Sequence, residues 1–437
     1  MISEELETIS LDNNLNLNLV SIPGGRTVLF SVAFYAGAMY ETNFGNGSND
    51  GISHFLEHMF FKGPTPSNRT TKQINDEFTR LGADLNAYTT YDHTVYYAKV
   101  PTRNLHKVAE IWKDLLVKKA IDPAEFEAEK QVVLQEIQLY DDIPEFKANF
   151  AVRKKHFAGT PLEHNILGTL DSVSSITLEM MTSYIDQYYS FDNAMVNLIG
   201  GGFDLKSEKE FLSSLFADPI TNPRNIPIYP PSVVMPSKKS NITYFSFPSL
   251  KPLSYVSLCW DTPGISSKHF FPSLLLNTFL GNSRTSLLYK EIISKGIAPS
   301  CTYGFESFND VCAGNIFFFS PPLKTDEVFN TVIDLLIKFK DTVITSDEIQ
   351  ALKEEIWGSF LTDIEDPTNY GIDLTQKYIK FRKLLPAKDF YDKIFGITPE
   401  EIHSAKDQIF EEMNMTVYAT GTIPKDWEPK FPDKGPW

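Results

Sequence analysis

The chain has 437 residues, enough for two or three domains, and its 42% hydrophobic and 22% charged residues are usual for a globular protein. Its 40 basic and 56 acidic residues give a net charge of −16. This balance argues against a nucleic-acid-binding surface, which needs clustered Lys and Arg, and is compatible with a basic peptide or partner.

The sequence shows no sign of membrane insertion or secretion. No uncharged apolar run is long enough to cross a bilayer, and the first residues are acidic where a secretory signal would be basic. The three cysteines, Cys259, Cys301 and Cys312, show no paired CxxC spacing, which suggests a reducing compartment. We therefore expect a cytoplasmic protein without a membrane span.

Strand-like and helix-like segments follow one another irregularly, which favours an α+β fold over a regular parallel sheet. β-branched and aromatic residues favour strands. Apolar residues at helical spacing favour helices, and Gly82 is expected to end the helix over 71–81. The strands expected on this basis are 27–36, 94–100 and 255–260, and the helices are 71–81, 104–118 and 270–280.

A proline-rich stretch near the middle predicts a domain boundary. Prolines remove backbone donors and fix φ, so residues 217–241 cannot form a helix interior or a central strand. We expect an N-terminal domain over 1–216, a linker over 217–241 and a C-terminal domain over 242–437.

Residues 50–61 predict a helix that carries chemistry on one side. His54, Glu57 and His58 fall at positions i, i+3 and i+4, so the two imidazoles can share one ion. Zinc suits two histidine nitrogens, and a glutamate beside them can act as a general base. The order HxxEH is that of the inverted zinc-peptidase motif. A separate apolar stripe consists of Ile52, Phe55, Leu56, Met59 and Phe60.

A catalytic zinc site usually has three protein ligands, so a third is expected from another element. The best candidate is the helix that begins with Asp122 as N-cap and Pro123 as its first residue. Glu129 and Glu136 lie on one face of this helix. They are roughly 10 Å apart along its axis, so both cannot bind one zinc. The pattern alone leaves the choice between them open.

Three stretches, residues 51–63, 81–89 and 129–137, resemble the pitrilysin-type inverzincin peptidases, particularly the short members of the processing-peptidase type. The resemblance implies an α+β fold of two homologous α/β-layered domains that face each other across a chamber. It also implies a peptidase with one Zn2+ per chain.

The same resemblance implies roles for individual residues. Glu136 would be the third zinc ligand beside His54 and His58, and Glu129 would support catalysis next to the base, Glu57. The edge strand that receives an extended peptide substrate would contain Asn86, Ala87 and Tyr88.

The second half departs from the family pattern at one place. Active members carry an Arg and a Tyr, seven residues apart, that bind the substrate backbone, but Ile293 and Pro299 occupy these positions here. Arg284 and Tyr303 lie nearby with the wrong spacing. In short two-chain members a homologous partner supplies the pair, so we expect this chain to be the zinc-bearing half of a heterodimer.

Two other functions are compatible with parts of the sequence. The chain could be a non-catalytic subunit of a larger assembly, although such relatives commonly lose a zinc ligand or the base. It could also be a zinc hydrolase of small molecules, although the edge-strand match and the two-domain length favour a peptidase. The substrate cannot be identified from the sequence.

Overall fold

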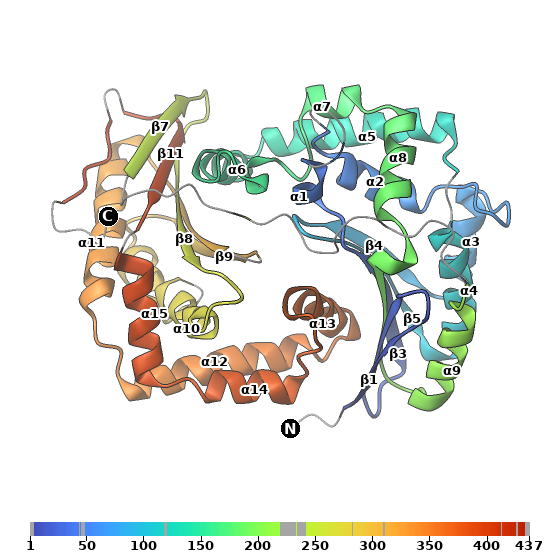
Figure 1. The fold of residues 1–437 in the computed structure, drawn as a ribbon. Helices are drawn as coiled ribbons and strands as arrows, with labels where there is room; N and C mark the ends of the chain where they lie inside the picture. Colours follow the sequence, from blue (N-terminus) through green and yellow to red (C-terminus); the bar gives the residue numbers. More distant parts are fainter. Residues whose placement is uncertain are drawn as a thin grey trace. The chain divides into compact units, whose positions relative to one another are not determined.

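The computed structural model contains two β-sheets, each with helices packed on it, which confirms the predicted α+β fold (Figure 1). It describes residues 4–42, 44, 49–117, 120–218, 233, 242–281, 283–308, 311–411, 413–424 and 427–432. The chain folds into two compact units. The first comprises Met1–Gln138, His164–Pro231 and Leu361–Lys388, and the second comprises Leu139–Glu163, Ser232–Phe360 and Asp389–Trp437.

The first unit contains a six-stranded sheet in the order β1-β2-β6-β3-β5-β4. Only β2 and β6 pair in parallel. Among the described residues, strand β4 pairs with β5 alone and therefore forms one edge. The strands are β1 (Glu5–Ser10), β2 (Asn16–Ser21), β3 (Thr27–Phe34), β4 (Asp84–Thr89), β5 (Thr94–Pro101) and β6 (Ala194–Gly200).

Helices cover both faces of this sheet. Phe30 of β3 packs against Trp112, with ring centroids 6.0 Å apart, whereas its neighbour Leu29 contacts Gly371. Since successive strand residues point to opposite faces, α4 and α13 lie on opposite sides. The helices wholly or mainly in this unit are α1 (Ala38–Glu41), α2 (Ile52–Phe60), α3 (Thr71–Arg80), α4 (Leu105–Leu116), α5 (Pro123–Asp141), α7 (Leu170–Ser175), α8 (Leu178–Tyr188), α9 (Leu205–Leu215) and α13 (Pro367–Phe381).

The second unit contains a five-stranded sheet in the order β7-β11-β8-β10-β9. Its strands are β7 (Ile242–Pro248), β8 (Ser254–Pro263), β9 (Ser300–Ser307), β10 (Val311–Ser320) and β11 (Met415–Gly421). The helices wholly or mainly in this unit are α6 (Pro144–His156), α10 (Phe270–Leu280), α11 (Thr325–Asp341), α12 (Ser346–Asp363), α14 (Ala387–Phe395) and α15 (Pro399–Glu411).

The compact units are not continuous halves of the chain. Helix α13 comes from the second half of the sequence but packs on β3 and β6 of the first sheet. Helix α6 comes from the first half but packs on β8 and β11 of the second. The boundaries predicted at 216 and 242 stay a prediction. Of the predicted linker, only Ala217, Asp218 and Val233 are among the described residues.

Local sequence signals lie where the predictions put them. Asp122 caps α5, because its Oδ1 accepts the backbone N–H groups of Ala124 and Glu125 at 2.8 and 3.0 Å. Gly82, with φ of +66°, follows the last turn of α3. Each predicted strand and helix is present, with ends shifted by at most a few residues.

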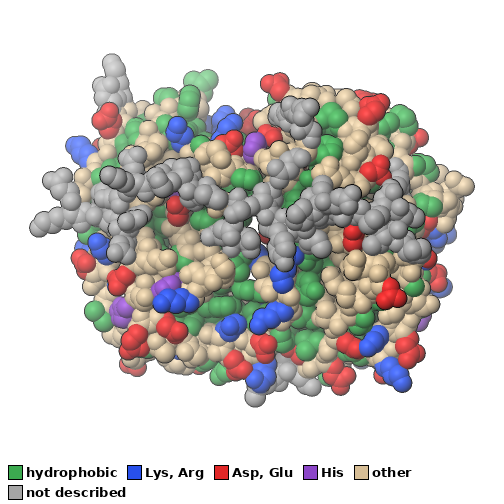
Figure 2. Space-filling model, in the orientation of Figure 1, with side chains coloured by type: hydrophobic (Ala, Val, Ile, Leu, Met, Phe, Trp, Pro, Cys, Tyr) green, Lys and Arg blue, Asp and Glu red, His purple; other side chains and the backbone are tan. Residues whose placement is uncertain are grey.

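The visible surface shows no segregation of charge. Acidic and basic side chains are interspersed on the face in Figure 2, so the net negative charge is not gathered into one area of that face. Within the described part of the chain, no helix has both the length and the apolar character needed to cross a membrane.

Candidate metal centre

Helix α2 carries the HxxEH residues, and its start is fixed by backbone geometry and one buried acid. Gly51 precedes the helix with φ of +92°, and a Cβ there would lie 2.6 Å from the carbonyl oxygen of Leu167. The carboxylate of Glu41 accepts the N–H groups of Gly51 and Ser53 at 2.9 and 2.8 Å. Burial raises the pKa of Glu41 to about 8, although these bonds act to lower it.

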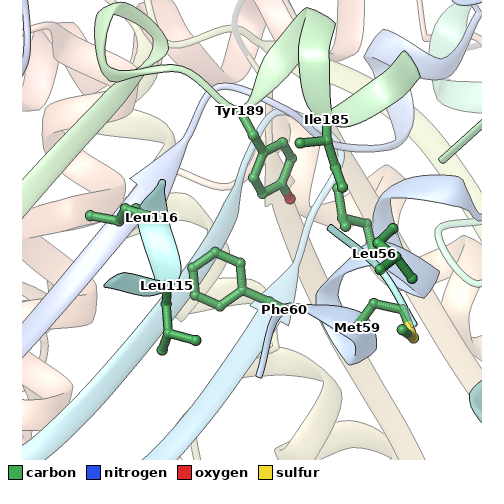
Figure 3. Close-up of a pocket in the computed structure, with 8 residues that line it drawn as sticks. Leu56, Met59, Phe60, Leu115, Leu116, Ile185 and Tyr189 are labelled. Carbon is green, nitrogen blue, oxygen red and sulfur yellow. The ribbon is translucent and has the colours of Figure 1, made fainter. Parts of the chain in front are cut away.

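The apolar stripe of α2 faces the interior. Leu56, Met59 and Phe60 border a small pocket whose other walls come from α4, α8 and their neighbours (Figure 3). Its internal space of about 20 Å³ has room for about one water molecule. The two histidines lie on a different side of α2, near α5.

The two histidines of α2 converge on one carboxylate of α5. The Nε2 atoms of His54 and His58 lie 3.7 and 3.3 Å from Oε2 of Glu136. One potential ligand atom from each residue lies within 4.8 Å of those of the other two. Ring packing between Phe55 and Phe126, with centroids 5.0 Å apart, holds the two helices together.

These distances fit a shared metal ion better than a hydrogen-bonded cluster. Charge-assisted hydrogen bonds are about 2.7–2.9 Å long, shorter than either Nε2 to Oε2 distance. Ligand atoms about 2.0–2.2 Å from one tetrahedral ion lie roughly 3.3–3.6 Å apart. Two imidazoles and one carboxylate are also a donor set that suits zinc in a catalytic site.

Glu129 contacts the other nitrogen of His58 rather than the ligand atoms. Its Oε1 lies 2.9 Å from His58 Nδ1, and its Oε2 lies 2.7 Å from the ammonium of Lys62. A carboxylate at this nitrogen fixes the imidazole with Nε2 free for a metal. In the described part of the chain, the buried Nδ1 of His54 has no such partner.

The two histidines have pKa values displaced in opposite directions. Burial, together with the charge of His58, lowers the pKa of His54 to about 4. Burial also acts to lower the pKa of His58, but the neighbouring carboxylates of Glu129 and Glu136 raise it to about 9. In the metal-free protein near neutral pH, His58 therefore holds a proton and His54 does not.

We expect zinc binding near neutral pH to release about one proton per zinc, because the ion must displace the proton of His58. Apparent zinc affinity should rise about tenfold per pH unit from neutrality and level off above the His58 pKa of about 9. Titration calorimetry in two buffers of different ionisation enthalpy measures the released proton. Zinc binding with no proton release at neutral pH would contradict this arrangement.

Glu57 lies beside the three converging residues and is held by strand β4. Its Oε2 accepts a hydrogen bond from the Thr89 hydroxyl at 2.7 Å. Burial raises the pKa of Glu57, although the Thr89 bond and the charge of His58 act to lower it. A glutamate so placed can take a proton from a water molecule near the two histidines.

The predicted substrate-binding residues lie on β4, which is an edge strand as expected. The side-chain oxygen of Asn86 accepts the N–H of Ala87 at 2.8 Å. Tyr88 packs against His93 and Tyr97, on the face opposite to that of Thr89.

Tyr303, the nearby tyrosine with the wrong spacing, is not free to replace the missing one. Tyr303 is buried between β9 and α10, and its hydroxyl donates to Oδ1 of Asn277 at 2.8 Å. Ile293 ends a short π-helical turn, and Pro299 directly precedes β9. In the described residues, the one group of three or more potential metal ligands is that of His54, His58 and Glu136.

Three polar residues that contact the site were not foreseen from the sequence. Lys62 follows His58 by four positions but lies beyond the end of α2 at Phe60, so helical spacing does not predict its contact with Glu129. Glu41 and Thr89 reach α2 from other elements, and no local pattern marks them. Their contacts depend on tertiary folding.

Comparisons with known proteins agree with this geometry. Residues 18–170 match the sequence model of insulinase, peptidase family M16, and residues 175–356 match that of the peptidase M16 inactive domain. An uncharacterized zinc protease of Bacillus subtilis is 25% identical over 412 residues, covering 93% of this chain and 96% of that protein. The mitochondrial-processing peptidase subunit beta of Lentinula edodes is 26% identical over 433 residues, covering 95% and 90%.

Solved structures share the fold. A protease from Helicobacter pylori superposes with a TM-score of 0.85 at 20% identity, covering 97% of this chain and all of that one. A peptidase M16 inactive domain from Pseudomonas fluorescens gives a TM-score of 0.84 at 17% identity, with the same coverage. On the two matched family models and these relatives, the chain belongs to peptidase family M16.

Proposed function

We propose that this chain is a zinc-dependent endopeptidase with its metal held by His54, His58 and Glu136. The observation that carries the proposal is the convergence of two imidazole Nε2 atoms on one carboxylate oxygen, with a second, partly buried carboxylate beside them. Relatives named as zinc proteases across almost the full length of the chain support the choice of metal and reaction.

The residues of the site have separate tasks in peptide hydrolysis. Zinc, when bound, supplies a Lewis acid that polarises the scissile carbonyl and makes water easier to deprotonate. Glu57 takes the proton of the attacking water and passes it to the leaving amine. Its raised pKa suits a base that must also give the proton back. Glu129 and Lys62 keep the ring of His58 in its metal-facing orientation.

Within the described residues, β4 has one edge without a strand partner, which supports an extended peptide as substrate. An added strand pairs with backbone groups and leaves its side chains on alternate faces. The hydroxyl of Thr89 on this strand reaches the carboxylate of Glu57, so a peptide bond on β4 would lie near the base. We propose that the segment of β4 with Asn86, Ala87 and Tyr88 receives such a peptide.

We further propose that full activity needs a homologous partner subunit. An intact metal-binding set beside the missing Arg and Tyr pair supports this, as does the similarity to subunits of mitochondrial-processing peptidase. The replacement residues Ile293 and Pro299 carry no side-chain donor for a substrate carbonyl.

A quenched fluorescent peptide library tests both parts of the proposal. The zinc-loaded chain should cleave library peptides, lose activity after chelation and regain it with zinc. Adding a homologous chain that carries the Arg and Tyr pair should raise the rate. If the zinc-loaded chain cleaves nothing with or without the partner, the peptidase proposal fails. Full activity of the chain alone would contradict only the partner requirement.

A further inference from the structure

Thr89 is the last residue of β4 and connects the edge strand to the metal-binding helix. Its side chain lies on the face of β4 that packs against α2, where its Oγ1 is 2.7 Å from Oε2 of Glu57. The hydrogen bond is partly buried. The same residue thus offers its backbone at the sheet edge and its hydroxyl to a carboxylate.

The direction of this hydrogen bond follows from the neighbouring groups. A threonine hydroxyl has one proton to donate. The hydroxyl of Thr94, 3.4 Å from that of Thr89, donates to the carbonyl oxygen of Ala36 at 2.8 Å. Because a carboxylate oxygen accepts, and lies closer than the Thr94 hydroxyl, Thr89 donates its proton to Oε2 of Glu57.

Because of this bond, the two carboxylate oxygens of Glu57 differ in their hydrogen bonding. Oε2 is engaged by Thr89, whereas no hydrogen bond within the described residues reaches Oε1. Rotating the carboxylate away would break a charge-assisted bond and leave a partly buried hydroxyl without it. Within the described residues, Oε1 is thus the oxygen left without a hydrogen bond, while Oε2 is held.

We propose that Thr89 is a positioning residue that sets the orientation of the Glu57 carboxylate relative to a peptide bound on β4. This inference rests on the proposed peptidase function. Strand β4 would align the substrate and also holds the Glu57 carboxylate. The attacking water and the scissile bond would therefore be positioned by the same strand. Such alignment acts on the chemical step more than on substrate binding.

Two substitutions test the proposal. Thr89→Val keeps the branched shape and strand preference but removes the hydroxyl, whereas Thr89→Ser keeps the hydroxyl. We expect Thr89→Val to lower kcat roughly 10- to 100-fold, the range found when outer hydrogen-bond partners around metal sites are removed. KM should change less than about twofold, because backbone contacts remain. Thr89→Ser should restore most of kcat. A Thr89→Val enzyme with wild-type kcat would overturn the proposal.

A double variant separates action through Glu57 from direct contact with substrate. In a Glu57→Gln background, Thr89→Val should cause little further loss of kcat, since the base that it positions is already absent. An equal fold-loss in both backgrounds would show that Thr89 acts independently of Glu57. Zinc affinity of Thr89→Val should match that of the wild type, since Thr89 does not touch His54, His58 or Glu136.

Crystal structures test the role of Thr89 without any measurement of activity, so this test is separate from that of the proposed function. In crystals of the metal-free protein, the Glu57 carboxylate should have one orientation in the wild type and several in Thr89→Val. The same single orientation in both would overturn the positioning role even if the enzyme is active. If the wild type cleaves no peptide, the function proposal fails, and the crystallographic comparison still decides the role of Thr89.

Discussion

Replacement of Glu57 by glutamine is expected to lower kcat roughly 100- to 10,000-fold, the usual range for loss of a general base. The amide has the same shape and its oxygen can still accept the Thr89 hydrogen bond, but it cannot take a proton from water. Zinc should stay bound, because the converging ligand atoms belong to His54, His58 and Glu136. Steady-state cleavage of a fluorescent peptide and metal analysis of the purified variant measure the two outcomes.

A matched control is Glu110→Gln, which makes the same chemical change at an exposed position on α4. It should leave kcat and zinc content at wild-type values. A Glu57→Gln protein that keeps zinc and cleaves at the wild-type rate would exclude Glu57 as the base. A variant that loses zinc would instead show that Glu57 supports the metal, contrary to its position beside the ligand set.

The motif on α2 was predictable because its information is local. Histidines four residues apart on a helix are neighbours whatever the rest of the chain does, and the apolar stripe that orients the helix is visible in the same window. The choice between Glu129 and Glu136 was not predictable from pattern alone, since both lie on one face of α5. The structure brings Glu136 to the two Nε2 atoms and Glu129 to Nδ1 of His58.

Contacts between distant segments set the limit of prediction from the sequence. Glu41 and Thr89 reach α2 from a short helix and an edge strand, and neither lies in a motif that marks such a contact. Prolines indicated a boundary between two halves, but not that α6 and α13 each pack on the sheet of the other half. The local sequence pattern shows that a helix has an apolar face, but it does not show which sheet that face packs on.

Two glutamates on α5 should differ sharply in their effect on zinc binding. Glu129→Gln keeps all three converging ligand atoms but weakens the support of His58, so zinc affinity should fall roughly 10- to 100-fold. Glu136→Gln replaces the proposed charged ligand by a neutral amide and should reduce affinity by more than that. Competition with a chromophoric chelator at fixed pH measures both values.

The control for this pair is Glu127→Gln on the same helix, an exposed residue whose one ion pair in the described chain is with Lys130. It removes one negative charge near the site without touching either histidine, so zinc affinity should stay close to that of the wild type. This comparison separates ligation from the general loss of charge. If Glu129→Gln weakens zinc binding more than Glu136→Gln does, the roles assigned to the two glutamates are reversed. In that case, the fixed ring of His58 matters less than direct coordination by Glu129.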